Sequence, residues 1–225
     1  MSSNNPAQRL VWDLPTRAFH WLLALSLAAS YVTSLIGFDA RQYHMWLGYW
    51  MIGLLTFRCV WGLVGTRHAR FINFFPTPRR LFNYIKNTVR GESPETVGHN
   101  PLGSLMIFAT LAILGAQAVS GLFMDDEIMF SGPYFNSASP ELASTMNFLH
   151  NNLINVILGL VAVHIAAVLY HSFVRRERII RAMLSGKKSA DVVPEGESIS
   201  GSRLGLAVAI AIATAAFTYW LVTRT

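Results

Sequence analysis

Five runs of mostly apolar residues, each about as long as a lipid bilayer is thick, alternate with polar segments along the chain. A helix needs ~20 residues to cross the hydrocarbon core of a membrane. The apolar runs cover residues 18–38, 44–64, 101–124, 149–173 and 204–222. The pattern therefore predicts five membrane-spanning helices.

Helix-start signals support two of these assignments. Asp13 followed by Pro15 is typical of the residues that cap and begin a helix. Asn100 followed directly by Pro101 has the same character and precedes the third apolar run. We therefore expect the first and third helices to begin at these positions.

A polar segment separates the fifth apolar run from the other four. Residues 181–203 are polar and contain Gly, Ser, Pro and Glu, a composition typical of a linker. The last run, residues 204–222, is then an appended helix. The fold class that we expect is an all-α integral membrane protein, with a four-helix transmembrane bundle and one extra C-terminal transmembrane helix.

The composition favours the same class. Of 225 residues, 52% are hydrophobic and only 13% are charged, which is too apolar for an ordinary soluble domain. The single cysteine, Cys59, excludes a disulfide within the chain, and the Cys-x-x-Cys-His haem attachment motif is absent. Any haem would therefore have to be bound non-covalently.

The positive charges fall on one side of this topology. The net charge is +6. Fifteen of the eighteen Lys and Arg residues lie in three segments: before the first run, between the second and third runs, and between the fourth and fifth runs. The positive-inside rule then puts the amino terminus in the cytoplasm and the carboxyl terminus on the outer side of the membrane. Topology accounts for the basic loops, so we expect no nucleic-acid partner.

Four histidines fall at two depths of the predicted bundle. His150 and His164 are fourteen residues apart, which on a helix places them on nearly one face and ~21 Å apart along the axis. His44 shares the outer level with His150, and His20 shares the inner level with His164. Antiparallel helices bring such pairs face to face, and a six-coordinate haem iron fits between two imidazoles. For any one histidine, packing or proton relay is an equal alternative.

An arginine and two glycines fit the same interpretation. Arg58 follows His44 by fourteen residues, at the depth of the inner pair, and a cation at that depth needs a partner. A haem propionate would serve, although an Arg that reaches the interface is an equal alternative. Gly48 and Gly159 would let a flat macrocycle approach a helix, or would serve ordinary helix packing.

Three further histidines lie outside these two levels. His171, near the cytoplasmic boundary of the fourth run, is either an interfacial residue or a group that handles quinone protons. His68 and His99 fall in the basic loop, and we expect both to be surface residues.

Three segments resemble a known family. They are VWDLPTRAFHWLLALSLAASY, HMWLGYWMIGLLTFRCVWGLVGTRHARF and FLHNNLINVILGLVAVHIAAVLYHSF. They are similar to the bacterial cytochrome b561 family and to the b-type cytochrome subunits of nickel–iron hydrogenases, over about residues 10–180. The resemblance implies a four-helix membrane domain holding two non-covalent haem b groups. The ligands that it implies are His20, His44, His150 and His164. The fifth helix departs from the shortest members.

The function that this resemblance implies is electron transfer between the quinone pool and a redox partner. The partner would be a hydrogenase or dehydrogenase subunit, or a periplasmic c-type cytochrome that docks on the acidic loop DDEIMFSGPYF. A self-sufficient superoxide:quinone oxidoreductase is the main alternative. A third is a non-redox transporter or scaffold, which the sequence disfavours because the apolar runs contain no acidic residue and no broken helices.

Overall fold

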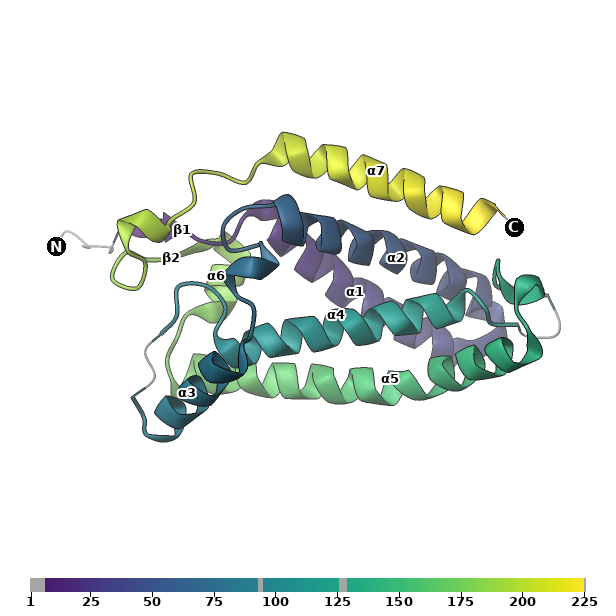
Figure 1. Ribbon diagram of the computed structural model, residues 1–225, viewed down its shortest axis with the longest axis horizontal. Helices are drawn as coiled ribbons and strands as arrows, with labels where there is room; N and C mark the ends of the chain where they lie inside the picture. Colours follow the sequence, from purple (N-terminus) through teal and green to yellow (C-terminus); the bar gives the residue numbers. More distant parts are fainter. Residues whose placement is uncertain (1–6, 93–94, 126–128, 225) are drawn as a thin grey trace. The chain divides into compact units, whose positions relative to one another are not determined.

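The computed structural model describes residues 7–92, 95–125 and 129–224, and most of them are helical (Figure 1). Seven α-helices are present in this part of the chain: α1 (Leu14–Ile36), α2 (Arg41–Val64), α3 (Pro78–Val89), α4 (Pro101–Gly121), α5 (Pro140–Leu169), α6 (Ile179–Ser185) and α7 (Leu204–Thr223). Two three-residue strands, β1 (Gln8–Leu10) and β2 (Lys187–Ser189), form one antiparallel pair in which Arg9 lies opposite Lys188.

Four stretches of the described chain are long and apolar enough to cross a membrane: Leu14–Val64, Pro101–Gly121, Pro140–Val174 and Leu204–Thr223. The first stretch contains both α1 and α2, which the short 3-10 helix Gly37–Ala40 joins. Gly37, at φ +80°, allows the left-handed turn that ends α1. Large apolar side chains are exposed along these stretches, which suits contact with lipid. The chain is a multi-pass membrane protein.

The fourth predicted helix is longer than its apolar run. α5 begins at Pro140, nine residues before the expected start at residue 149. Pro140 takes the first helical position, and the hydroxyl of Ser139 accepts a hydrogen bond from the backbone N–H of Leu142 at 3.3 Å. These signals start a helix in polar sequence, so α5 extends beyond the apolar part. After Leu169 the helix continues as the π-helical turn Tyr170–Val174.

The chain divides into two compact units. Unit 1 consists of Met1–Ala18, Val60–Phe108 and Ala162–Ala207. Unit 2 consists of Phe19–Cys59, Ala109–Val161 and Val208–Thr225.

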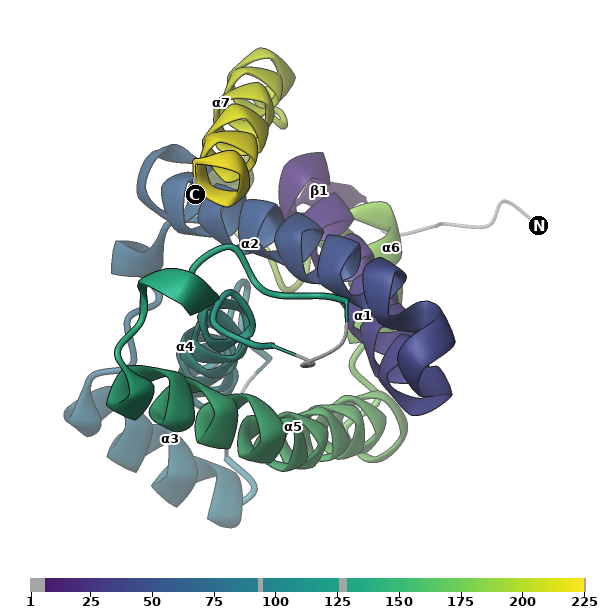
Figure 2. The same ribbon diagram turned by 90° about the vertical axis from the view of Figure 1, so that its right-hand side faces the viewer.

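Unit 2 contains parts of α1, α2, α4, α5 and α7, and Figure 2 looks toward its helix ends. Its core is built from Met51, Leu55, Leu114 and Ile157, which are all buried. Within the unit, α7 packs against α2, because an added Cβ at Gly53 would lie 3.3 Å from Oγ1 of the buried Thr218. A small residue at such a contact is typical of membrane helices that approach closely.

Unit 1 folds the segment 181–203 back over the amino terminus. We expected only a linker there, yet it contains β2, and its Val193 joins Val11, Trp12 and Ala182 in a small core. Lys188 is buried and pairs with Glu95 at 3.1 Å and with the carbonyl of Thr96 at 2.8 Å. The segment is therefore part of a packed unit.

This packing corrects one prediction about the basic loop. His68 was expected at the surface, but it is buried, and its Nε2 lies 2.8 Å from the carbonyl oxygen of Glu197. The prediction was wrong because residues 181–203 cover this part of the loop. His99 is partly buried, with its ring centroid 4.5 Å from that of Trp12 and 4.3 Å from that of Phe74.

Asp13 caps α1, as its position in the sequence predicted. Its side chain is 1% exposed and accepts hydrogen bonds from the N–H of Thr16 at 2.7 Å and from the indole of Trp61 at 3.2 Å. The hydroxyl of Thr66 donates to its other oxygen. Asn100 caps α4 in the same way, accepting from the N–H of Gly103 at 2.7 Å.

We expect Asp13→Ala to lower the stability of the protein by about 3 kcal/mol, because a helix cap and two buried hydrogen bonds are lost together. Thermal unfolding in detergent, followed by circular dichroism, measures the effect. Asp13→Asn is the matched control. It keeps one acceptor oxygen for the cap and should destabilise the protein less than Asp13→Ala.

Candidate functional site

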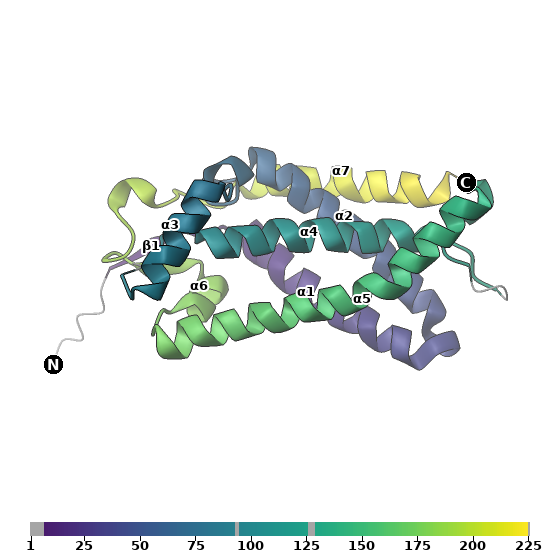
Figure 3. The ribbon, with the colours of Figure 1, turned by 60° about the horizontal axis from the view of Figure 1, so that its bottom comes forward.

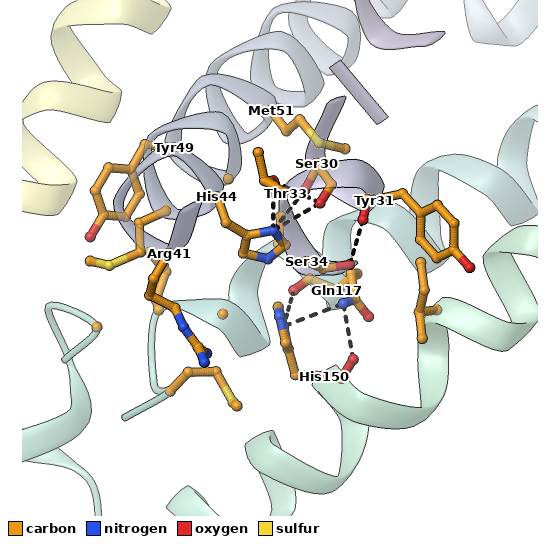
Figure 4. Close-up of a pocket in the computed structure, with 18 of the residues that line it drawn as sticks. Ser30, Tyr31, Thr33, Ser34, Arg41, His44, Tyr49, Met51, Gln117 and His150 are labelled. Carbon is orange, nitrogen blue, oxygen red and sulfur yellow. Dashed lines mark hydrogen bonds between the residues drawn. The ribbon is translucent and has the colours of Figure 1, made fainter. Parts of the chain in front are cut away.

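A cavity of about 340 Å³ lies inside unit 2. Residues from α1, α2, α4 and α5 line it, together with the loop that follows α4. Its walls mix apolar side chains of the core, such as Met51, Leu114 and Ile157, with a small set of polar groups. Figure 4 shows these polar groups gathered around two histidines.

His44 of α2 and His150 of α5 face each other across this cavity (Figure 4). Their ring centroids are 6.2 Å apart, and their planes are nearly perpendicular at 87°. The sequence predicted that these two rings share one level of the bundle, and the fold brings them together.

Each ring is held through its Nδ1 atom. His44 donates from Nδ1 to the carbonyl oxygen of Ser30 at 2.9 Å, and His150 donates from Nδ1 to the carbonyl oxygen of Gln117 at 3.1 Å. Because a carbonyl only accepts, Nδ1 carries the proton in both rings. The lone pair of Nε2 is then free in each ring to bind a metal, which is the usual arrangement of a ligating histidine.

Hydroxyl groups complete the surroundings of both Nδ1 atoms. Thr33 Oγ1 lies 3.3 Å from Nδ1 of His44, and the fully buried Ser120 Oγ lies 3.2 Å from Nδ1 of His150. The side-chain amide of Gln117 also donates to the carbonyl oxygen of His150 at 3.0 Å. Sequence reasoning missed these groups. Gln117 and Ser120 could have been found as polar residues inside the apolar third run.

Gly48 and Gly121 are two of the four glycines that line the cavity. An added Cβ at Gly121 would lie 3.0 Å from Cε1 of His150, so a side chain there would displace the ring. An added Cβ at Gly48 would meet nothing within 4 Å, so space is open beside α2 at this point of the cavity wall. Gly159 on α5 also faces open space. The roles of Gly48 and Gly159 beside a macrocycle stay predictions.

The residues around the cavity suit a metal ion that has most of its ligands in a cofactor and takes only two from the protein. Two imidazoles that bind one iron from opposite sides at roughly 2 Å each have centroids roughly 6 Å apart, close to the separation in this structure. In the described part of the chain, no group of three or more His, Cys, Asp or Glu residues is placed to hold a metal ion. Apolar walls and two opposed imidazole nitrogens therefore suit a metal inside a planar macrocycle, such as haem.

The inner pair of predicted ligands falls in different units. His20 lies on α1 in unit 2, with its ring centroid 5.0 Å from that of Trp21. His164 lies on α5 in unit 1, and its side chain is exposed. Arg58 lies on α2 in unit 2 and is only 3% exposed, so its side chain is enclosed by the protein. The roles of these three residues stay predictions.

His171 lies on the π-helical turn at the end of α5, in unit 1. Its Nδ1 is 2.9 Å from Oε2 of Glu177, and Oε1 of Glu177 is 3.5 Å from Nε of Arg175. The role of His171 beside a quinone stays a prediction. Single π-helical turns are frequent at functional sites.

Comparison with known proteins gives a consistent set of relatives. Residues 11–186 match the family described as prokaryotic cytochrome b561. The chain is 25% identical over 213 residues to a probable Ni/Fe-hydrogenase B-type cytochrome subunit of Bradyrhizobium diazoefficiens, covering 79% of this chain and 85% of the relative. It is 26% identical over 210 residues to the protein of the same name in Azotobacter chroococcum, covering 78% and 86%. A third of that name, from Rhizobium leguminosarum, is 27% identical over 214 residues, covering 79% and 87%.

Proposed function

Because the chain belongs to the prokaryotic cytochrome b561 family, we propose that it is a di-haem cytochrome that transfers electrons between the quinone pool and a redox partner protein. Membership makes it a membrane b-type cytochrome of electron transport. The two haems, the quinone and the partner are the parts that we propose.

The observation that supports this function best is the opposed pair His44 and His150. Both Nδ1 atoms donate to backbone carbonyls, so the two Nε2 lone pairs are available on either side of one site. A haem b bound there would supply an iron that accepts and releases one electron. His44 and His150 would hold such a haem from its two sides and would leave no iron position open for oxygen. Burial and the hydrogen bonds at Nδ1 would tune its potential.

We propose that His20 and His164 hold a second haem and that Arg58 pairs with a haem propionate. The support for the ligands is their common level in the predicted bundle, and for Arg58 it is the burial of a cation inside an apolar helix. Arg41 also lines the cavity beside His44 and offers a cation for a propionate of the first haem (Figure 4). A guanidinium pairs well with a carboxylate.

The domain organisation that we propose has a di-haem membrane domain at residues 10–180, a cytoplasmic segment at 181–203 and an additional transmembrane helix at 204–222. The clustering of Lys and Arg supports a cytoplasmic amino terminus and a periplasmic carboxyl terminus in the bacterial inner membrane. A reporter enzyme that is active only in the periplasm, fused after Thr225, should be active. An inactive but intact fusion would reverse this orientation.

For the partner, the relatives' names support a hydrogenase or another dehydrogenase. A periplasmic c-type cytochrome is the alternative acceptor or donor, with the acidic loop after α4 as its docking site. Asp126 and Glu127 of that loop lie outside the described residues.

Absorption spectroscopy of the purified protein tests the proposed function. We expect a reduced-minus-oxidised spectrum of six-coordinate haem b, two haems per chain and reduction of both by a quinol. A colourless protein that does not take up added haem would contradict the proposal and favour a transporter or scaffold. Reduction of quinone by superoxide, with the isolated protein as catalyst, would favour the superoxide:quinone oxidoreductase instead.

We also propose that His171 exchanges protons with the quinone, with Glu177 as its partner. His171→Ala should then slow reduction of the haems by quinol about tenfold or more, since a positioned acid–base group contributes at least that much. Stopped-flow absorption measures the rate. Haem content should stay unchanged, which separates this role from haem ligation. An unchanged rate would remove His171 from the quinone site.

A further inference from the structure

α3, the short helix between α2 and α4, has one strongly apolar side, and none of the residues on it is buried. Every residue of α3 is at least partly exposed, including Phe82 at 68% and Val89 at 83%. At ~100° per residue, Leu81, Phe82, Ile85 and Val89 fall within one arc of roughly 100°. The side chains that a surface helix normally buries are therefore at least partly exposed in α3.

The rest of α3 is mostly polar, and all of its charges are positive. Residues 78–90 contain four cations, Arg79, Arg80, Lys86 and Arg90, and no acidic residue. Arg79, Lys86 and Arg90 fall on one flank of the apolar arc at helical spacing. An apolar arc with cations beside it is the pattern of a helix that lies in the surface of a membrane containing anionic lipids.

The chain that leads into α3 lies against the ends of two spans. The rings of Phe71, Phe74 and Phe75 pack on Phe108 of α4, with centroids 5.3, 5.8 and 5.5 Å from its ring. Phe71 also lies on α2, because an added Cβ at Gly62 would collide with its ring. The aromatic segment thus joins α2 to α4 just before α3 begins.

These contacts fix the level at which α3 starts. Phe108 lies seven residues into the span that begins at Pro101, roughly 10 Å along the helix axis. The segment that packs on it therefore lies alongside the first turns of this span, at the end of α4 from which the chain enters the membrane. In Figures 1 and 3, α3 then runs obliquely to the first turns of α4. Thr77 accepts from the N–H of Arg80 and caps α3 at this point.

We propose that α3 is an interfacial helix, with Leu81, Phe82, Ile85 and Val89 inserted among lipid acyl chains and its cations bound to the phosphates of anionic lipids. A twelve-residue helix is marginal in water by itself, so a lipid surface would also stabilise it. The helix would hold the loop between α2 and α4 on the membrane surface. This inference is independent of haem binding.

Nitroxide labels in the full-length, haem-loaded protein test this placement. On a Cys59→Ser background, Phe82→Cys and Asn87→Cys place one label on the apolar side and one on the polar side. In vesicles of phosphatidylcholine and phosphatidylglycerol, we expect the label at position 82 to collide more with oxygen, which dissolves in lipid, than with a water-soluble nickel chelate. The label at position 87 should show the opposite preference.

A triple variant, Arg79→Gln, Lys86→Gln and Arg90→Gln, tests the role of charge. Replacing phosphatidylglycerol by phosphatidylcholine should reduce the insertion of the label at position 82 in the parent protein and have little effect in the triple variant. Circular dichroism and the haem spectrum should match those of the parent in every case. Equal exposure of positions 82 and 87 to the nickel chelate would overturn the proposal, as would protection of position 82 only when a partner protein is added.

Discussion

Substitution of either histidine that faces the cavity, His44→Ala or His150→Ala, is expected to remove one haem and lower the content from two per chain to one. The remaining ring offers a single nitrogen, Nε2, since its Nδ1 donates to the carbonyl of Ser30 in His44 or of Gln117 in His150. It therefore cannot replace the nitrogen that is lost on the opposite side of the site. Haem extraction into alkaline pyridine, referred to protein concentration, measures the loss.

Two controls separate loss of a ligand from loss of the fold. His68→Gln changes a buried histidine of unit 1 and should leave both haems in place. Added imidazole should enter the space that His44→Ala creates and restore the lost absorbance, because it supplies the missing nitrogen. Retention of two haems in both His44→Ala and His150→Ala would show that this pair does not bind haem.

The helices could be predicted from the sequence because their signals are local. The length of an apolar run and a cap such as Asp13 or Asn100 depend on a few neighbouring residues, and both caps are present as expected. The β1–β2 pair could not be predicted in this way. It joins residues about 180 positions apart, through strands of only three residues. The error about His68 has the same origin, since the segment that buries it is distant in sequence.

The candidate site was predictable in part for a related reason. Helical spacing and an antiparallel arrangement were enough to put His44 and His150 at one level, and their rings do meet. The groups that orient them were not predictable. Both acceptors are backbone carbonyls, which every residue has, so no residue type marks them. The register between neighbouring helices selects Ser30 and Gln117, and that register depends on tertiary packing.

The second large effect on haem content is expected from the other pair of histidines, which we infer to be a pair from their positions in the sequence. His20→Ala or His164→Ala should each remove one haem and leave the haem between His44 and His150 in place. Double variants give the sharper result. We expect His20→Ala with His164→Ala to keep one haem, because both changes damage the same site, whereas His44→Ala with His164→Ala should keep none.

The test compares the haem content of two double variants, one with both changes in the same proposed pair and one with a change in each pair. A general loss of stability would lower the haem content of both and would not produce this difference. Thermal unfolding of both double variants checks that they are folded to the same extent. If His44→Ala with His164→Ala retained one haem, these two residues would ligate the same iron, and the assignment of ligands by depth would be wrong. If the variants divide as expected, His44 with His150 binds one haem and His20 with His164 binds the other.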